Sequence, residues 1–357
     1  MNMFNGVYQN KTVLVTGHLG FKGSWLVFWL KELGANVSGL SLLPNSQLIH
    51  SQLLDLQIDS EIGDIRDTKL IDKVFNSRKP DIVFHLAAQS LVIDSYIDPI
   101  NTYTSNILGT INILEACKKY GTSVLINITS DKAYKNLEQE KGYVEEDSLG
   151  GKDPYSCSKS CADLIAASYM ESFFQEGEST LVANCRSGNV IGGGDWSRNR
   201  LFTDIVESAT SQKVLSIRNP NATRPWQHVL DPLSGYLVLG EKLINREREF
   251  VGAWNFGPTI DDDLSVQEVI KITKRYWNSI EVHFKSSESN FHESQLLRLD
   301  CSKAENNLGW SSVWGVDKAI ERTINWYKSF YSKGNLLTRD DFSVYIQDAK
   351  RKNMFWT

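Results

Sequence analysis

The sequence has little that would suit a secreted or membrane-bound protein. Residues 1–11 are mostly polar and lack the apolar core of a signal peptide. The apolar run at 25–30 is far shorter than the roughly 20 residues that a membrane helix needs. The five cysteines are odd in number and irregular in spacing, which indicates reduced thiols rather than disulfides. We therefore expect a cytoplasmic protein that makes no contact with a membrane.

Clusters of basic residues and of metal ligands are also scarce. The 357 residues include 38 Lys and Arg against 43 Asp and Glu, a net charge of −5, so we expect no nucleic-acid partner. Cys157 and Cys161 lie close together, but no second pair of Cys or His follows at the spacing of a zinc site. We expect no metal and interpret both cysteines as packing residues on a helix. An anionic small molecule remains compatible with this charge.

Short apolar runs alternate with segments of helical periodicity through the first half of the chain. Strands are expected at 11–15, 36–40, 81–86, 124–129 and 180–185, and helices at 24–33, 106–120 and 156–174. Apolar strands separated by helices predict an α/β fold with a doubly wound parallel sheet of the Rossmann type. The regular alternation stops beyond residue 186, which indicates a second, smaller C-terminal lobe that packs against the first and leaves a cleft.

A glycine-rich loop joins the first expected strand to the first expected helix. Residues 16–23 read T-G-x-x-G-x-x-G, and glycines let the backbone turn tightly against a pyrophosphate that the helix N-terminus stabilises. An ordinary glycine-rich turn is the alternative, because the pattern is weak outside a strand–loop–helix context. We predict that the loop binds a dinucleotide through Gly17, His18, Gly20, Phe21, Lys22 and Gly23.

The choice between NAD and NADP is less clear from the residues. An acidic residue at the end of the second strand would bind the adenosine ribose of NAD, but Ser41 stands near that position, without an Arg for the 2′-phosphate of NADP. Asp64 and Ile65 follow the next expected strand, where they can hold the adenine. We favour NAD and keep NADP as the alternative.

A Tyr–Lys pair provides a candidate base. Tyr155 and Lys159 are four residues apart, so they share one face of the helix expected there. A phenol with a free pKa of about 10 is a poor base at neutral pH, whereas an adjacent ammonium group lowers its pKa. An exposed pair without function is the alternative. The preceding dinucleotide loop, and the expected strand end at Thr129 and Ser130, make the pattern more specific.

Together these motifs resemble the extended short-chain dehydrogenase/reductase family. The resemblance includes Leu86, Ala87 and Ala88 at a strand end and Asn106 in the following helix. Longer stretches are similar to the CDP-glucose 4,6-dehydratase branch of that family, from about residue 11 to residue 310. These stretches are TGHLGFKGSWL, EIGDIRD, NITSDKAY, GGKDPYSCSK, GNVIGGGDW, RPWQHV and WNFGP.

The resemblance implies a redox-neutral dehydration of a CDP-sugar. Tyr155 would take the proton of the sugar C4 hydroxyl as hydride passes to NAD, and Lys159 would tune Tyr155 and hold the nicotinamide ribose. Water would then leave across C5–C6, and hydride would return to C6. Asp131 would be the acid, with a pKa raised by burial, and Ser130 would bind the C4 oxygen. Lys132 replaces the Glu base of related dehydratases and acts either as a base or as a cation.

The resemblance also assigns cofactor and substrate contacts. It places Leu86, Ala87, Ala88, Asn106 and Thr129 beside NAD. Substrate-binding residues would be Gln89, Asn189, Arg200, Arg224 and Asn255. Arg suits the pyrophosphate because its planar guanidinium binds phosphate oxygens in pairs. One departure is Ile93, where the family pattern has Arg, and it leaves the nucleotide and the sugar less certain.

The resemblance implies an interleaved pair of domains and an oligomer. A Rossmann-type domain would span 1–187 with a return segment at 229–256, and a substrate-binding lobe would span 188–228 and 257–357. Helices at 106–120 and 156–174 would pair across a two-fold axis, which gives a homodimer or homotetramer. The resemblance also suggests that the product is used to make deoxysugars of surface polysaccharide.

A nucleotide-sugar 4-epimerase, which has no use for Asp131 and Lys132 as an acid/base pair, is the main alternative function. A member of the family without catalytic activity would more readily have lost Tyr155 or Lys159.

Overall fold

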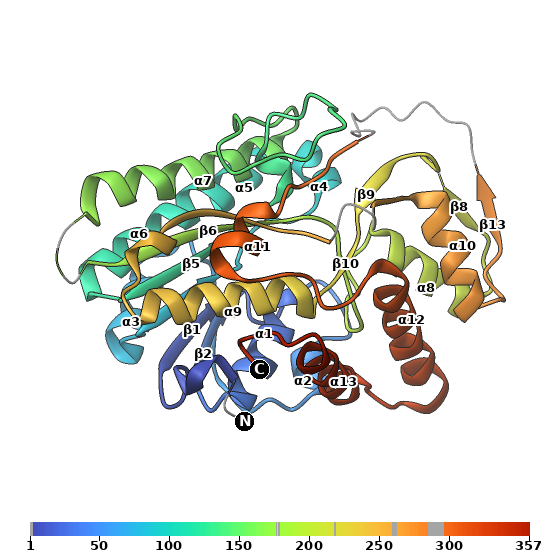
Figure 1. Cartoon of the computed structure of the whole chain (residues 1–357), viewed down its shortest axis with the longest axis horizontal. Helices are drawn as coiled ribbons and strands as arrows, with labels where there is room; N and C mark the ends of the chain where they lie inside the picture. The colour runs from blue at the N-terminus through green and yellow to red at the C-terminus, as the bar shows by residue number, and fades with distance from the viewer. Residues whose placement is uncertain (1–2, 176, 178, 218, 259–262, 285–295) are drawn as a thin grey trace.

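Seven short strands pair in parallel to form a central twisted sheet (Figure 1). The structure is a computed structural model that describes residues 3–357 except 176, 178, 218, 259–262 and 285–295. The strand order is β11-β6-β5-β4-β1-β2-β3, which confirms the predicted Rossmann-type sheet. The strands are β1 Thr12–Thr16, β2 Asn36–Ser41, β3 Asp59–Ile62, β4 Ile82–His85, β5 Val124–Ile128, β6 Leu181–Ser187 and β11 Gly252–Phe256.

Helices cover both faces of this sheet because successive strand residues point to opposite sides. In β1, Val13 and Val15 pack with α1 and α9 in one core cluster, whereas Leu14 packs with α3, α6 and α7 in another. These helices are α1 Phe21–Glu32, α9 Leu230–Ile244, α3 Thr68–Arg78, α6 Gly109–Tyr120 and α7 Pro154–Phe173. Continuous burial of the strands on both faces explains why they are apolar throughout.

Shorter elements connect the layers of the first lobe. They are the helices α2 His50–Leu53, α4 Val92–Ile97 and α5 Pro99–Tyr103, a π-helical turn at Thr104–Leu108, and 3₁₀ turns at Met3–Gly6, Asp131–Ala133 and Arg248–Phe250. The single helix expected at 106–120 therefore begins as a π turn that precedes α6. None of the helices in the described part of the chain is long and apolar enough to cross a membrane.

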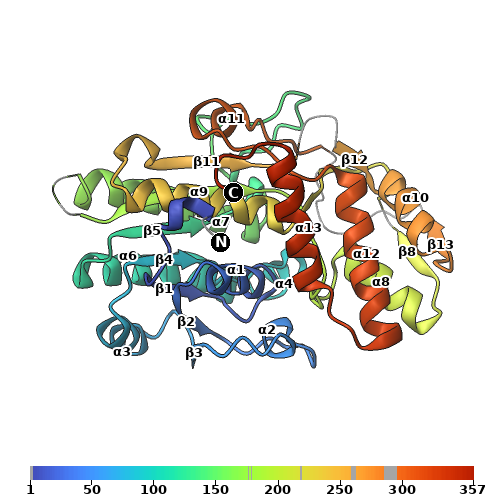
Figure 2. The ribbon, with the colours of Figure 1, turned by 60° about the horizontal axis from the view of Figure 1, so that its bottom comes forward.

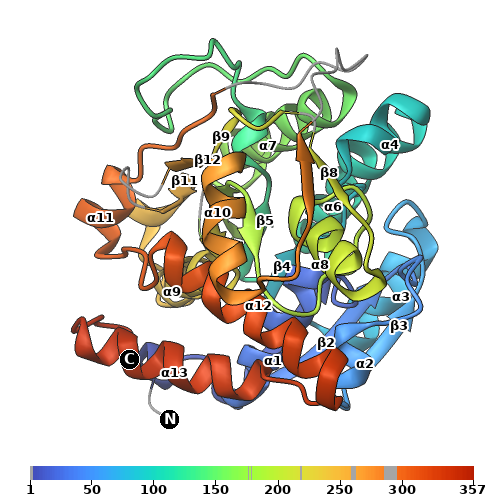
Figure 3. The same ribbon diagram turned by 90° about the vertical axis from the view of Figure 1, so that its right-hand side faces the viewer.

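A smaller lobe stands beside the carboxyl ends of the strands (Figure 3). Its core combines residues of α8, β8, α10 and α12. The elements are α8 Leu201–Ser211, β8 Leu215–Ile217, α10 Val266–Tyr276, β13 Val282–Phe284, α12 Val316–Lys333, and the short strands β7 Val190–Ile191, β9 Thr223–Pro225, β10 Gln227–His228 and β12 Asp263–Ser265. Strand pairs β7–β10 and β8–β13 are parallel and β9–β12 is antiparallel.

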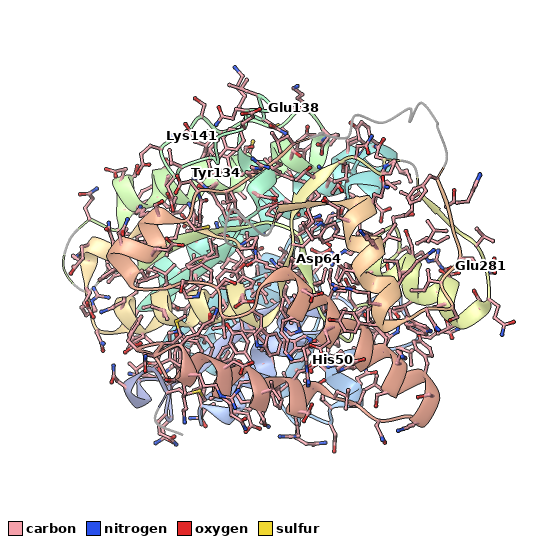
Figure 4. The ribbon with its side chains drawn as sticks, turned by 45° about the vertical axis from the view of Figure 1, so that its right-hand side comes forward. His50, Asp64, Tyr134, Glu138, Lys141 and Glu281 are labelled. Carbon is pink, nitrogen blue, oxygen red and sulfur yellow. The ribbon has the colours of Figure 1, made fainter. Side chains whose placement is uncertain are left out.

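The last helices return to the first lobe. They are α11 Ser302–Leu308 and α13 Thr338–Arg351. Phe4 donates its backbone N–H to the Trp356 carbonyl at 2.8 Å, and the two rings stack with centroids 5.3 Å apart. Figure 2 shows the two ends of the chain close together beside α13. His50 of α2, which is labelled in Figure 4, shares a hydrogen bond of 2.8 Å with Thr338 at the start of α13. The proposed division into two domains stays a prediction, although β11 does join β6 in the central sheet.

A buried ion pair fastens α7 to the sheet. Arg186 of β6 donates through Nε and Nη2 to both carboxylate oxygens of Asp163, each at 2.8 Å. Their side chains are 4% and 2% exposed. Thr129 and Asn184 also donate to this carboxylate at 3.0 Å. Because every charge is paired by several hydrogen bonds, the cost of burying the pair is offset.

Removing one partner of this pair should destabilise the fold strongly. We expect Asp163→Asn to lower the free energy of unfolding by about 3–5 kcal/mol, because the Arg186 charge stays buried without an anion. The exposed pair of Asp72 and Lys119 offers a control, and Asp72→Asn should change stability little. Urea denaturation of both variants measures the difference. Equal stabilities would contradict a structural role for the buried pair.

Candidate active site

The predicted site residues gather where the strands of the central sheet end. β2 and β3 lie on one side of β1 and β4 lies on the other, so the strand order reverses between β1 and β4, and ligands of such sheets bind at the carboxyl ends of the strands at this point. The phosphate loop follows β1, and Ser130 follows β5. The second lobe faces the same ends of the strands (Figure 3). Side chains from both lobes therefore reach one region.

The glycine-rich loop has the geometry of a pyrophosphate cradle. Gly17 has φ +75°, and a Cβ there would lie 2.8 Å from the Ala87 backbone nitrogen. A Cβ at Gly23 would lie 2.1 Å from the Gly17 carbonyl oxygen. Helix α1 begins after Gly20 without a side-chain cap, which leaves its first N–H groups for an anion. The residues present therefore fit a bound dinucleotide.

Two side chains of this loop make hydrogen bonds within the protein. His18 is fully buried against Gly39 of β2 and shares a hydrogen bond of 2.7 Å with Ser60, and burial lowers its pKa to about 4. The imidazole of His18 is therefore engaged within the protein, and a contact of this residue with the cofactor stays a prediction. Lys22 points inward, and its ammonium group donates to the Ser187 hydroxyl at 2.8 Å. Burial and the charges of Arg200 and Lys159 lower the pKa of Lys22 to about 7.

Ser41 and Asp64, which we predict to contact the adenosine, lie at the end of β2 and after β3, and both side chains make hydrogen bonds within the protein. The Ser41 hydroxyl donates to the Leu42 carbonyl at 2.9 Å. The carboxylate of Asp64 accepts hydrogen bonds from the backbone and guanidinium of Arg66, which lowers its pKa. Asp64 remains partly exposed (Figure 4). Ile65 is buried, and a Cβ on Gly109 would lie 2.4 Å from it.

Asn106 acts as a brace within the protein. Its amide oxygen accepts from the Gln89 backbone N–H at 2.7 Å, and its amide nitrogen donates to the Gln89 carbonyl and to the Ser158 hydroxyl. These hydrogen bonds engage its polar atoms within the protein, and the side chain is 2% exposed, so a contact between Asn106 and NAD stays a prediction. It holds the segment after Leu86, Ala87 and Ala88 against α7. The π turn presents Asn106 at this point.

Gln89 is held in the same way. Its side-chain nitrogen donates to the Leu91 carbonyl and to the Thr102 hydroxyl, each at 2.9 Å, and its side-chain oxygen accepts from the Leu91 N–H. These bonds leave little of the amide for a substrate. A contact between Gln89 and a substrate therefore stays a prediction, and in this structure its side chain holds the segment around Leu91.

Helix α7 presents Tyr155 and Lys159 to the site. The helix begins with Asp153, which accepts from the Ser156 N–H at 2.9 Å, and with Pro154 in its first turn. Tyr155 is 8% and Lys159 7% exposed. Lys159 donates to the Ile128 carbonyl at 3.1 Å. The predicted pair therefore lies side by side at the end of β5.

The pKa of Tyr155 differs from the sequence expectation. Burial raises it to about 12, and the charge of Asp131 raises it further, whereas Ser130 and Arg200 lower it. Burial likewise lowers the pKa of Lys159 to about 8. Lys159 thus does not bring the phenol toward neutrality in this structure. Desolvation outweighs the charge pair because both groups are enclosed.

Ser130, Asp131 and Lys132 form a 3₁₀ turn directly after β5. The Ser130 hydroxyl donates to Asp131 Oδ1 at 2.9 Å and accepts from the Lys132 backbone N–H at 3.2 Å. Burial raises the pKa of Asp131, against the lowering effects of Lys132 and Arg224. Asp131 Oδ2 is buried without a hydrogen-bond partner in the described residues. This carboxyl group is therefore suited to act as an acid, as the sequence predicts.

The second lobe contributes arginines to this region. Arg200 donates to Asp195 at 2.8 Å and lies 3.4 Å from the Ser90 hydroxyl, and its charge acts on Tyr155. Arg224 lies on β9, and its charge acts on Asp131. Both predicted cations therefore approach the Tyr155–Asp131 region. Asn189 is half-buried beside β7, and its carbonyl accepts from the Gln227 N–H at 3.0 Å.

Asn255 is held within the protein. Its side chain accepts from the Tyr134 hydroxyl at 2.7 Å and donates to the carbonyls of Tyr143 and Asp300. Full burial leaves none of its polar atoms for a substrate. Tyr134 lies beneath the outer loop that carries Glu138 and Lys141 (Figure 4). Asn255 as a substrate ligand stays a prediction, and in this structure its amide is bound by Tyr134, Tyr143 and Asp300.

Sequence reasoning missed several polar partners of the site. Ser187 at the end of β6 accepts from Lys22 and shares a hydrogen bond of 2.8 Å with Tyr236 of α9. Asp195 orients Arg200. The sequence signal that could have indicated these partners is Lys22 in the phosphate loop, because a lysine there needs a partner from a distant segment, which is Ser187. Within the described ranges, no three His, Cys, Asp or Glu side chains converge to hold a metal ion.

Comparisons with known proteins agree with this geometry. The family model described as GDP-mannose 4,6 dehydratase matches residues 14–323. The chain is 42% identical over 355 residues to the CDP-glucose 4,6-dehydratase of Salmonella typhimurium, with 96% of this chain and 98% of the relative covered.

Solved structures support the same fold. An epimerase from Methanothermobacter thermautotrophicus has a TM-score of 0.81 at 25% identity, over 95% of this chain and 98% of that one. The dTDP-glucose 4,6-dehydratase of Bacillus anthracis in complex with NAD has a TM-score of 0.76 at 23% identity, over 90% of this chain and 97% of that one.

A side chain on the phosphate loop should prevent binding of NAD. We expect Gly17→Ala to weaken NAD binding by about tenfold or more, because its Cβ would meet the Ala87 backbone and displace the loop. Gly121→Ala is the matched control, since Gly121 has φ +68° but open space around it. Titration calorimetry with NAD compares the two variants. Equal affinities would show that the close approach of Gly17 to Ala87 is not needed for NAD binding.

Proposed function

The chain belongs to the GDP-mannose 4,6-dehydratase family, and from this membership we propose that it converts CDP-glucose into CDP-4-keto-6-deoxyglucose and water. NAD is the cofactor, and when bound it accepts hydride from C4 and returns it to C6. The observation that carries the proposal is the 42% identity to a CDP-glucose 4,6-dehydratase over nearly the whole of both chains. The enzyme is thus a hydro-lyase without net redox change.

We propose that Tyr155 takes the proton of the C4 hydroxyl. It lies on the same helix face as Lys159, at the end of β5 where a ligand meets the sheet. Its phenol must ionise for this step, and the positive charge of Arg200, which lowers the pKa of Tyr155, supports the phenolate. Lys159 is also placed to hold the ribose of the nicotinamide.

Asp131 is the proposed acid for departure of the C6 hydroxyl. Burial raises its pKa, which favours the protonated carboxyl group, and its Oδ2 has no hydrogen-bond partner in the described structure. A 4-epimerase has no step that needs such an acid, which favours dehydration. Lys132 adjoins it and serves either as the base at C5 or as a cation that stabilises the enolate.

The nucleotide part should meet the cations of the second lobe. Arg200 and Arg224 approach the catalytic region from α8 and β9, and a CDP-sugar brings two phosphate charges. Arg200 also contacts Ser90, close to the position of Ile93, where the family pattern has an arginine. We propose that Arg200 supplies the positive charge that Ile93 does not.

An exposed apolar face supports the proposal of a homodimer. Ile97 and Ile100 are 76% and 75% exposed on α4 and α5, and Leu108 and Leu164 are 44% and 55% exposed on the π turn and α7. These elements are in mutual contact and so form one face. Exposed apolar side chains gathered on helices indicate an interface.

We also propose a cellular setting. Cys117, Cys157, Cys161, Cys185 and Cys301 are all free thiols, which supports the cytoplasm as the compartment. The product, a 4-keto-6-deoxy sugar nucleotide, suits deoxysugar synthesis for surface polysaccharide such as lipopolysaccharide.

The reaction itself can be tested in deuterated water. With CDP-glucose and NAD, we expect a product that has lost one water and gained one deuterium at C5, without net formation of NADH. Mass spectrometry detects it, with UDP-glucose and dTDP-glucose as competing substrates. An isomer of unchanged mass would identify an epimerase instead, and turnover of another nucleotide sugar alone would overturn the assignment of CDP-glucose.

The role of Tyr155 gives a further check. We expect Tyr155→Phe to lower kcat by roughly 10²–10⁴-fold, the usual contribution of a general base. Tyr169→Phe is the matched control, because Tyr169 lies on the same helix and donates to Glu115 on the surface. Comparable activity of the two variants would remove Tyr155 from the chemistry.

The proposed dimer can be tested by adding charge to its surface. We expect the wild type to have twice the mass of one chain in light scattering, and Leu164→Glu to be a monomer because a carboxylate would be buried. Val214→Glu is the control, since Val214 is also 55% exposed but lies in the second lobe. A dimer that survives Leu164→Glu would place the interface elsewhere.

A further inference from the structure

The chain that leads into helix α7 is pressed against the first turn of that helix. A Cβ on Gly151 would lie only 2.2 Å from the Cβ of Ser156. The Gly150 backbone N–H donates to the Ala133 carbonyl at 2.9 Å. The entry of α7 is thereby tied to the 3₁₀ turn that carries Asp131.

The side chain of Asp153 closes this entry. Its Oδ1 accepts from the Ser156 backbone N–H at 2.9 Å, and its Oδ2 accepts from the Ser156 hydroxyl at 2.6 Å. Its backbone carbonyl accepts from the Cys157 N–H at 2.9 Å. Asp153 therefore satisfies donors that the first turn of a helix otherwise leaves free, and it is only 8% exposed.

Tyr155 stands in the same turn, two residues after Asp153, and Lys159 follows one turn later. Helical side chains lean toward the N-terminus of their helix, so the side chain of Tyr155 leans toward the end at which Asp153 lies. Both residues are buried, so little water screens the carboxylate from the phenol. Burial raises the pKa of Tyr155 to about 12, and the charge of Asp153 is among the causes that raise it further.

Titratable groups of other elements also face these two residues. Asp131 after β5 raises the pKa of Tyr155, as Asp153 does, and Arg200 at the start of α8 lowers it. Tyr103 of α5 faces Asp153, whose charge adds to the effect of burial in raising the pKa of that second phenol. Two carboxylates thus oppose the ionisation of Tyr155, and only Asp131 has a step of its own in the proposed reaction.

From this geometry we propose that Asp153 is a positioning residue for Tyr155, which caps the catalytic helix and places a negative charge beside the phenol that opposes its ionisation. The cap and the charge can be separated, because Asn caps a helix about as well as Asp but is neutral. If Asp153 were only a cap, its replacement by Asn would leave the pH dependence of the reaction unchanged. If its charge also acts on Tyr155, that replacement shifts the pH dependence.

The inference rests on the proposed function and is tested with the complete enzyme, NAD and CDP-glucose. We expect Asp153→Asn to move the acid limb of the pH profile of kcat/KM to lower pH, because the phenol ionises more readily without the anion. At a fixed pH on that limb, kcat/KM should rise by about twofold or more. Asp153→Ala also removes the cap, so it should lower both kcat and the melting temperature, whereas Asp153→Asn should keep the wild-type melting temperature.

Asp98→Asn is the matched control. Asp98 begins α5 in the same way, directly before Pro99, and accepts from the Asn101 N–H at 2.9 Å, but it is exposed. This variant should keep the wild-type pH profile. An acid limb that stays in place or moves to higher pH in Asp153→Asn would overturn the proposal, as would an equal shift in Asp98→Asn.

A second measurement follows the phenol without turnover. The absorbance of tyrosinate is recorded against pH, with NAD, for the wild type and for Asp153→Asn, and each is compared with its own Tyr155→Phe version. We expect the part of the signal that belongs to Tyr155 to appear at lower pH in Asp153→Asn, and an unchanged titration would contradict the effect of charge. Wild-type turnover of CDP-glucose tests the proposed function separately, so the two failures are distinguishable.

Discussion

The ion pair between Asp163 and Arg186 sets the position of the catalytic helix. Tyr155, Lys159 and Asp163 are spaced by four residues on α7, so they lie in one row along the helix. The carboxylate at the end of this row is fixed to β6 by Arg186 and to the end of β5 by Thr129. The base, the cation beside it and the 3₁₀ turn after β5 are thereby held in one arrangement.

Positive charge dominates the enclosed part of the site. Lys22, Lys159, Arg200 and Arg224 approach Asp131 from both lobes, and the pKa of Lys22 is lowered in part by the other cations. Such repulsion within a buried region costs free energy in the protein alone. The phosphate groups of a dinucleotide and of a nucleotide sugar would relieve it, so the binding of each anion also stabilises the cations that hold it.

Local patterns allowed much of the fold and the centre of the site to be predicted. The alternation of apolar strands and helices, the glycine spacing from Gly17 to Gly23, and the pair of Tyr155 and Lys159 all depend on residues close in sequence. The hydrogen bonds that the amides of Asn106 and Asn255 make with distant segments could not be predicted, because no local pattern reveals them. Burial also changed the pKa of Tyr155 in the direction opposite to the one expected, since it depends on the packing of both lobes.

The contact between Phe4 and Trp356 bears on the order in which the protein folds during synthesis. Phe4 packs on Trp29 of α1, and both rings contact Trp356. The first helix of the dinucleotide-binding region therefore lacks part of its covering until residue 356 has left the ribosome. The phosphate loop that starts this helix is therefore made long before Trp356, which covers the helix, can reach it.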